Sequence, residues 1–265
     1  MEKPAPSRTT DRAPLLGETD PPPVSVVRAG ARIDLLLLGD HAGNAIPSSL
    51  RELGLRAADR TRHIAWDVGV RALGERLSAI LEATFIHQPY SRLVIDCNRD
   101  SHSPDAILPV SDGTTVPGNT GLSNDACDER RLAIHAPYHG CIATELALRR
   151  RAGALAPLVV SLHSFTPTLA GERRPWQVGV LHDRGDTRPS RALLACLSHE
   201  RDLTVGDNQP YRMDGTDYTV PYHAYANELP YLELEFRCDL LADSEGADLW
   251  ANRCAAWIQE VMARI

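Results

Sequence analysis

The sequence has no closely spaced cysteines and no apolar stretch of membrane length. Its six cysteines are scattered, and none forms the C-x-x-C pair of a zinc ribbon or a thioredoxin motif. No apolar run is long enough to cross a bilayer, and no secretory hydrophobic region opens the chain. We therefore expect a reduced, cytoplasmic protein without a membrane partner.

Clustered positive charge is also missing. The chain has 28 lysines and arginines against 35 aspartates and glutamates, a net charge of −7. The short basic runs at 149–151 and 173–174 are typical of a helix end and a loop. Because binding to nucleic acid requires a concentrated basic surface, we expect no such partner and predict a small-molecule ligand. The oligomeric state is not indicated.

The distribution of apolar residues predicts an α/β fold. Strand-like runs occur at 33–39, 83–87, 92–97, 157–162, 176–182 and 230–236, and several lack polar alternation, as in strands covered on both faces. Helical spacing recurs at 66–82 and 245–264, with a third helical region at about 123–152. We predict a single three-layer α/β/α domain over residues 25–265, with a mostly parallel mixed sheet. A flexible arm rich in Pro, Thr and charge is expected over 1–24.

Polar residues gather where the expected strands end, which is where sheets of this kind carry their active sites. They are Asp40, His41 and Asn44 after the first run, Arg92, Asp96, Asn98 and Arg99 around the third, His163 after the fourth, and Glu233, Glu235 and Arg237 in the last. Each of them alone could be a turn residue or a surface ion pair. Together they indicate a site, because burying charge is costly.

This set of residue types suits a metal-dependent hydrolase. Neutral imidazoles bind Zn²⁺, and the ion brings the pKa of a bound water to about 7. A carboxylate can then accept a proton from the water. Arginines can hold an oxyanion or a substrate carboxylate through forked hydrogen bonds.

Four blocks of the sequence resemble the N-formylglutamate amidohydrolase family. They are DHAGNAIP, YSRLVIDCNR, LHSFTP and YTVPYHAYANELPYLELEFRCDLL, and the likeness covers roughly residues 33–241. More distantly, the layout is similar to that of zinc carboxypeptidases and aspartoacylase. In those families a metal-binding histidine, an Asn-Arg pair, a second histidine and a Glu-x-Arg follow one another in the order of His41, Asn98–Arg99, His163 and Glu235–Arg237.

The resemblance implies one zinc ion held by His41, His163 and a carboxylate. The carboxypeptidase turn supplies a glutamate where this chain has Asn44, which is a poor zinc ligand. The third ligand is therefore expected from Asp67 or Asp40, and Asp67 is favoured because the family also carries an aspartate there. A simpler interpretation of Asp67 is a favourable charge at a helix N-terminus. Asn44 would then orient the substrate or the metal-bound water.

The resemblance also implies the remaining roles. Glu235 would be the general base, with Glu233 as its competitor, and Arg92 would polarise the acyl oxygen. The other expected substrate-binding residues are Asn98 and Arg99 for an α-carboxylate, Arg237 for Glu235 or a side-chain carboxylate, and His139 and His223 in the pocket. A separate zinc site at His135 and His139 is disfavoured, because H-E-x-x-H lacks its glutamate here and Pro137 interrupts the helical pattern.

The expected function is that of a zinc-dependent amidohydrolase. It would remove a small N-acyl group, formyl by family analogy, from an acidic amino acid such as N-formylglutamate. One alternative is hydrolysis of another N-acyl amino acid or a small peptide. Another alternative is a binding protein that holds no metal. Asn44 leaves this alternative open because it stands where the carboxypeptidase turn has a metal-binding glutamate. Metal analysis of the purified protein would distinguish it from the enzyme.

Overall fold

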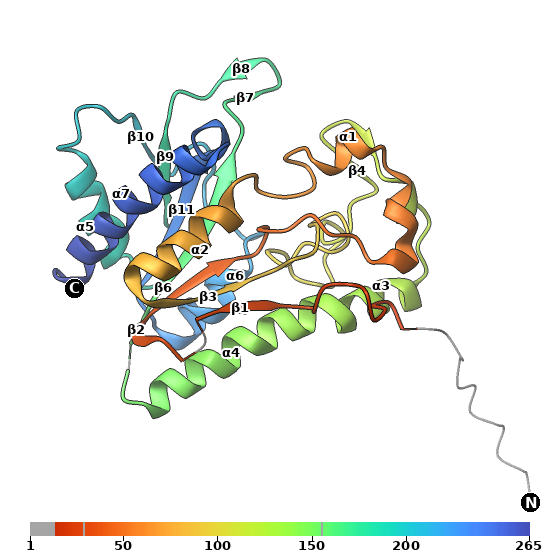
Figure 1. Ribbon diagram of the computed structural model, residues 1–265, viewed down its shortest axis with the longest axis horizontal. Coiled ribbons are helices and arrows are strands. Elements are labelled where there is room, and N and C mark those ends of the chain that lie inside the picture. Colours follow the sequence, from red (N-terminus) through yellow and green to blue (C-terminus); the bar gives the residue numbers. More distant parts are fainter. Residues whose placement is uncertain (1–13, 29, 155) are drawn as a thin grey trace, which may run out of the picture.

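A seven-stranded mixed sheet forms the centre of the computed structural model, which describes residues 14–265 except 29 and 155 (Figure 1). The strand order is β1-β3-β2-β6-β11-β9-β10. Strands β3, β2, β6 and β11 are parallel, β1 and β9 run antiparallel to their neighbours β3 and β11, and β10 is parallel to β9. The strands are β1 (Ser25–Val27), β2 (Arg32–Gly39), β3 (Ala83–His87), β6 (Leu158–Phe165), β9 (Val178–Leu181), β10 (Val205–Asp207) and β11 (Tyr231–Arg237).

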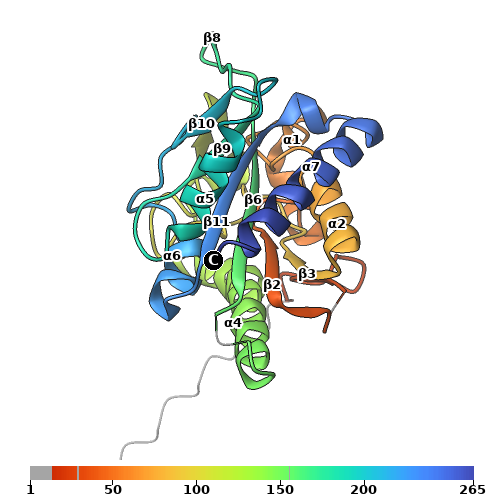
Figure 2. The ribbon, with the colours of Figure 1, turned by 90° about the vertical axis from the view of Figure 1, so that its left-hand side faces the viewer.

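Helices cover both faces of this sheet. Helices α2 and α7 lie on one side of the strands and α4 lies on the other (Figures 1 and 2). The longer helices are α2 (Val70–Leu81), α3 (Asn124–Arg130), α4 (Ala136–Arg151), α5 (Arg188–Leu197) and α7 (Ser244–Met262). The predicted three-layer α/β fold with a mostly parallel mixed sheet is confirmed.

Short elements complete the described chain. They are the hairpins β4 (Val110–Ser111) with β5 (Thr114–Thr115) and β7 (Thr168–Leu169) with β8 (Glu172–Arg173), the helices α1 (Ala57–Arg60) and α6 (Thr219–His223), the 3₁₀ turns η1 (Ser48–Gly54), η2 (Pro117–Asn119), η4 (Tyr225–Asn227) and η5 (Cys238–Leu241), and the π-helical turn η3 (Arg131–His135).

Alternation along β11 separates the core from the polar face. Leu232, Leu234 and Phe236 pack in the cluster formed with α2, α5 and α7. Glu233 and Glu235 lie on the opposite side, as period-two alternation predicts, and both line a cavity. The sheet thus turns two acidic side chains away from its larger apolar core.

Residues 92–97 were expected to form a strand, and this prediction is wrong. The segment runs as a series of turns, although Leu93, Val94 and Ile95 are fully buried. Side chains satisfy its backbone instead of a neighbouring strand: Asn119 donates to the carbonyl of Leu93, and Arg130 donates to that of Val94. A short apolar run indicates burial, which a packed loop provides as well as a strand does.

Pro137 does not interrupt the third helical region. The chain passes from α3 through η3 into α4 without a break, and Pro137 lies in the first turn of α4. Proline lacks an N–H donor, so it is tolerated at a helix start. The wide π-helical turn η3, directly before α4, accommodates the hydrogen bond that Pro137 cannot donate.

The arm expected to be flexible is packed in its described part. Leu15 is 4% exposed and belongs to the apolar cluster on the α4 side of the sheet. Tyr90 donates to the carbonyl of Pro21, and Gln88 donates to that of Pro23. Apolar anchors and these hydrogen bonds hold residues 14–24 against the domain, whereas 1–13 lie outside the described residues.

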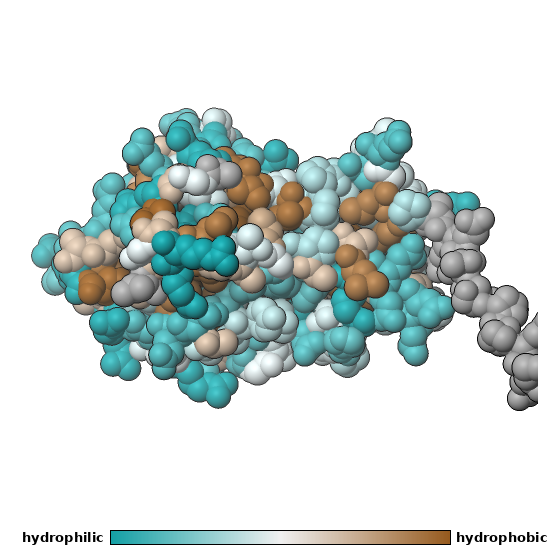
Figure 3. Space-filling model, turned by 90° about the horizontal axis from the view of Figure 1, so that it is seen from below, coloured by the Kyte–Doolittle hydropathy of each residue, from teal (hydrophilic) through white to brown (hydrophobic). Residues whose placement is uncertain are grey.

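The surface seen from below is mostly hydrophilic and carries separate apolar groups (Figure 3). Leu132 and Leu148 are among the exposed apolar side chains, at 70% and 51% exposure. Within the described part of the chain, no helix has both the length and the apolar character needed to cross a membrane.

Candidate active site

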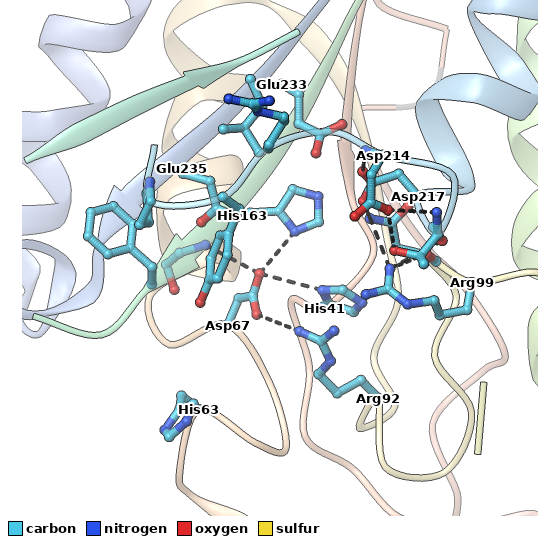
Figure 4. A pocket seen from close by; sticks show the side chains of 18 of the residues that line it. His41, His63, Asp67, Arg92, Arg99, His163, Asp214, Asp217, Glu233 and Glu235 are labelled. Atoms are coloured by element: carbon cyan, nitrogen blue, oxygen red, sulfur yellow. Dashed lines mark hydrogen bonds and ion pairs between the residues drawn. The ribbon is translucent and has the colours of Figure 1, made fainter. Parts of the chain in front are cut away.

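A cavity of about 510 Å³ lies at the carboxyl ends of β2, β6 and β11 (Figure 4). Its lining includes most of the residues that the sequence singled out: His41, Asp67, Arg92, Asn98, Arg99, His163, Glu233 and Glu235. They come from segments far apart in the chain. The parallel strands bring them together at one edge of the sheet, as the strand-end rule predicts.

Backbone contacts bring His41, Asp67, His163 and Glu235 close together. His41 lies two residues beyond the end of β2, and its carbonyl accepts a hydrogen bond of 2.9 Å from the N–H of Asp67. His163 lies inside β6, in register with Glu235 on β11. These contacts place two histidines and two carboxyl groups around the same space.

His41, Asp67 and His163 form a buried group that could hold a metal ion. One potential ligand atom from each lies within 4.8 Å of the others. The Oδ2 atom of Asp67 is 3.0 Å from Nδ1 of His163 and 3.5 Å from Nδ1 of His41. The latter nitrogen is buried without a hydrogen-bond partner among the described residues. An orphaned imidazole nitrogen facing a carboxylate and a second imidazole fits a zinc site.

The Nε2 atom of His41 and that of His163 each lie near a polar side chain outside the metal-binding group. Nε2 of His41 lies 2.7 Å from Oδ1 of Asp96. Nε2 of His163 lies 3.1 Å from Oγ of Ser161 and 3.7 Å from Oδ2 of Asp40. Such partners hold an imidazole with Nε2 protonated, which leaves Nδ1 available to a metal.

The side chains of this group shift one another's pKa values. Burial lowers the pKa of His163, but the hydrogen bond and charge of Asp67 outweigh it and hold that pKa well above its usual value. Burial and Arg92 lower the pKa of His41, while Asp96 and Asp67 raise it, with a net upward shift. Burial raises the pKa of Asp67, yet the two histidines bring it below its usual value. The site therefore favours a positive charge between these residues.

The two other candidate ligands take different places. Asn44 donates to the carbonyl of Arg60 over 3.3 Å and does not line the cavity, so the expectation that it orients the substrate or water is not supported. Of the described residues 40–46, only His41 lines the cavity. Asp40 accepts a hydrogen bond of 2.5 Å from the hydroxyl of Tyr138 and lies behind His163.

Arg92 reaches the edge of the metal-binding group. Its Nε and Nη2 atoms donate to Oδ2 of Asp96 at 3.1 and 2.7 Å, and its Nη1 lies 3.5 Å from Oδ1 of Asp67. The two carboxylates raise the pKa of Arg92 against the opposing effect of burial. A permanently charged guanidinium is thus fixed beside the candidate ligands.

Asn98 and Arg99 line the opposite side of the cavity. Oδ1 of Asn98 accepts hydrogen bonds from the N–H groups of Tyr218 and Thr219 at the start of α6. Nε of Arg99 lies 3.2 Å from Asp105, and its Nη1 lies 3.8 Å from Asp217. Much of the hydrogen-bonding capacity of this pair is already used within the protein.

Glu235 and Glu233 are both buried, at 6% and 3% exposure. Burial raises the pKa of each carboxyl group to about 8. Oε2 of Glu235 has no hydrogen-bond partner among the described residues. Two carboxyl groups with raised pKa values in one cleft are typical of a catalytic site.

Three expected substrate contacts lie outside the cavity lining. His139 and His223 hydrogen-bond to each other over 2.9 Å, and Nε2 of His139 is 2.9 Å from the carbonyl of Cys97. Burial lowers the pKa of His223 to about 4 and that of His139 well below its usual value. Both rings are therefore neutral supports behind the 97–99 loop. Arg237, the last residue of β11, pairs with Asp239 two residues along the chain.

The sequence did not reveal one wall of the cavity. Residues 210–217 contribute Tyr211, Arg212, Asp214 and Asp217 to the lining, and His63 adds a further side chain. This stretch has neither strand nor helix periodicity. Its Asp-rich polar composition was the only available signal, and many exposed loops share that composition.

Comparison with known proteins places this site in a family. The model of the N-formylglutamate amidohydrolase family matches residues 33–242. The chain belongs to the N-formylglutamate amidohydrolase family. The resemblance inferred from the four sequence blocks is confirmed, and membership supports hydrolysis of an amide bond. A comparison with curated proteins finds no match.

Two solved structures are similar to this member of the family. A gene product from Agrobacterium tumefaciens is 35% identical, with a TM-score of 0.90 and coverage of 94% of this chain and 98% of that one. The N-formylglutamate amidohydrolase from Ralstonia eutropha JMP134 is 18% identical, with a TM-score of 0.60 and coverage of 89% and 98%. At the lower identity the likeness shows a shared fold.

Proposed function

We propose that the protein is a zinc-dependent amidohydrolase that removes a formyl group from an N-formyl amino acid. N-formylglutamate is the substrate that the family name suggests. The observation that carries the proposal is the register of Glu235 with His163 in the sheet. It places a buried carboxyl group with an unpartnered oxygen beside a group of residues suited to a metal ion.

The ion would be held by His41, Asp67 and His163. When bound, zinc lowers the pKa of water and polarises a carbonyl oxygen. The outer partners Asp96 and Asp40 keep the two imidazoles oriented toward it. A third protein ligand from Asp67 leaves room for water or substrate, as in catalytic zinc sites.

Glu235 is the proposed general base. Its carboxyl group takes a proton from the attacking water and passes it to the nitrogen of the leaving amino acid. A base with a raised pKa is well matched to both transfers near neutral pH. Arg92 donates to the oxygen of the acyl group, where negative charge develops in the transition state.

Arg99 and Asn98 are the proposed contacts for the substrate α-carboxylate. Nη2 of Arg99 has no partner among the described residues, since the bonds of this guanidinium use Nε and Nη1. One donor therefore remains for the ligand. The protein's own hydrogen bonds hold both side chains in position before substrate arrives.

A hydrolysis screen with zinc supplied tests the proposal. N-formyl, N-acetyl and N-succinyl derivatives of one set of amino acids would be compared, together with the metal content of the purified protein. We expect one zinc per chain and fastest release from the N-formyl series. A protein that binds no zinc under metal-replete conditions, or that cleaves none of the derivatives, would contradict it.

A further inference from the structure

Arg174 is a buried guanidinium that forms no ion pair with a described residue. It is 8% exposed and follows directly after β8. Its planar group lies over two aromatic rings, 5.8 Å from the centroid of Phe165 and 4.9 Å from that of Tyr211. Its side-chain hydrogen bond runs from Nη1 to the hydroxyl oxygen of Tyr211, over 3.0 Å. Because burying a charge is costly, an arginine held only in this way calls for a role.

Tyr211 lines the cavity and has a donor to spare. In the hydrogen bond with Arg174 its oxygen accepts, so the hydroxyl proton is left over, and no described residue accepts it. A cation that donates to a hydroxyl oxygen polarises the hydroxyl and makes it a stronger donor. Tyr211 can therefore give one hydrogen bond to a group bound in the cavity.

The hydroxyl of Tyr211 lies among the charged groups of the candidate active site. Burial raises its pKa, and the charges of Glu235 and Asp67 add to this against the opposing effect of Arg174. Tyr211 is in turn one of the groups that raise the pKa of Arg92. Charge effects weaken with distance, so the hydroxyl is close to the proposed base and to the arginine proposed to hold the acyl oxygen. It stays protonated near neutral pH, as a donor must.

The backbone before Tyr211 is fixed against the sheet. The carbonyl of Gln209 lies so close to Gly179 in β9 and Gly206 in β10 that a Cβ atom at these positions would be 2.1 and 2.4 Å from its oxygen. Only glycine allows such an approach. The sheet thus sets the position of the chain two residues before Tyr211, while Arg174 holds the side chain itself.

We infer that Tyr211 is a further catalytic residue, whose hydroxyl donates to the acyl oxygen of the substrate, and that Arg174 positions this hydroxyl. The inference rests on the proposed function for the identity of the reacting group as an N-acyl amide. Arg92 is the proposed donor to the same oxygen, which can accept a second hydrogen bond and gains negative charge in the transition state. The hydroxyl keeps its proton, so proton transfer remains with Glu235.

Tyr211→Phe removes the hydroxyl and keeps the ring. We expect kcat to fall about 10²- to 10³-fold, as on loss of one donor to a developing oxyanion. KM and the zinc content should stay near those of wild type, because the contact strengthens only in the transition state. Tyr222→Phe changes a tyrosine that is 51% exposed and outside the cavity lining, and it should keep the wild-type kcat.

A double-mutant cycle tests the positioning role of Arg174. Arg174→Met should lower kcat about ten-fold or more in wild type, through loss of a hydrogen bond from a charged group. In the Tyr211→Phe background it should have no further effect, because Arg174 acts through the hydroxyl. Arg173→Met, which alters the exposed neighbour in β8, is the control. Equal losses from Arg174→Met in both backgrounds, with thermal unfolding unchanged, would overturn the positioning role.

A phosphinate analogue of N-formylglutamate tests the contact without hydrolysis. Its tetrahedral, anionic P–H phosphinate group replaces the formyl group. In calorimetric titrations of the zinc-loaded protein, the analogue should bind about ten-fold or more weakly to Tyr211→Phe than to wild type. Free glutamate, which lacks the phosphinate, should bind equally to both.

The two measurements separate this inference from the proposed function. If analogue binding depends on Tyr211 but no N-formyl derivative is cleaved, the contact stands and the proposed reaction fails. If cleavage is efficient and Tyr211→Phe changes neither kcat nor the affinity for the analogue, the reaction stands and the inference is overturned.

Discussion

Nε2 of His41 lies 2.7 Å from Oδ1 of Asp96, on the side of the ring opposite the candidate metal position. The same carboxylate accepts two bonds from Arg92 through its other oxygen. Asp96 therefore orients a candidate metal ligand and the arginine proposed to polarise the acyl oxygen. Burial raises its pKa, but Arg92 and His41 hold the pKa well below the usual range, so it stays charged.

Asp96→Asn is expected to weaken zinc binding without removing a ligand. An amide can still accept a hydrogen bond, but it loses the charge that stabilises the Nε2-protonated ring, so affinity should fall about 10- to 100-fold. Competition with a chelator measures the change. Asp112→Asn, which alters a surface carboxylate paired with Arg62, is the matched control. Equal zinc affinities in the two variants would show that Asp96 does not orient the ligand.

His41→Ala and His163→Ala are each expected to lose stoichiometric zinc. Each substitution removes one imidazole from a three-residue group, and two remaining ligands rarely retain the ion. Metal analysis after dialysis gives the result, and circular dichroism checks that the fold persists. His63→Ala changes another histidine of the cavity and should keep its zinc. Retention of one zinc per chain in both ligand variants would place the metal elsewhere.

Glu235→Gln is expected to lower kcat by on the order of 10²–10⁴ while zinc content stays at one per chain. The amide keeps the shape of the side chain but cannot accept a proton. Glu228→Gln provides an exposed carboxyl control. Loss of zinc in Glu235→Gln would make this residue a ligand. Near-normal turnover would move the role of base to another carboxyl group of the cavity.

Arg99→Lys tests recognition of the α-carboxylate. Lysine retains the charge but loses the planar guanidinium, which here already bonds Asp105 and the carbonyl of Asn98 while offering Nη2 to a ligand. We expect a larger rise in KM for an N-formyl amino acid than for its C-terminal amide. Equal effects on both compounds would assign Arg99 to loop structure instead.

The sequence predicted the sheet and the residues at the centre of the site better than it predicted the residues that line the rest of the cavity. Continuous apolar runs identified β2, β6 and β11, and the strand-end rule brought His41, His163 and Glu235 together. These predictions depended on local patterns and one general topology rule. By contrast, the misassigned strand at 92–97 shows that burial does not determine backbone conformation.

Residues acting through long-range contacts were harder to assign. His139 and His223 were expected in the pocket, but their side chains satisfy each other and the 97–99 loop from behind. Nothing in their local sequence distinguishes a ring facing a ligand from one facing a carbonyl. Arg237 donates to Asp239, two residues further along the chain, and does not line the cavity.

Stability should fall in acid partly because of His87, which is not one of the candidate metal ligands. This residue ends β3, is 2% exposed and stacks on Phe85 with ring centroids 5.0 Å apart. Burial, with a smaller contribution from the charge of Arg71, lowers its pKa to about 4. The unfolded chain takes up a proton near pH 6.5 and the folded protein does not until about pH 4, so unfolding becomes easier as the pH falls through this window.

His87→Gln should flatten this dependence, because glutamine has no proton to gain. Between pH 7 and 4.5, wild type is expected to lose about 2–3 kcal/mol more of its unfolding free energy than the variant does. Urea unfolding at a series of pH values, with metal content held constant, measures the difference. His102→Gln removes an exposed histidine and should follow wild type. Parallel curves for wild type and His87→Gln would mean that His87 is protonated to the same extent in the folded and unfolded states.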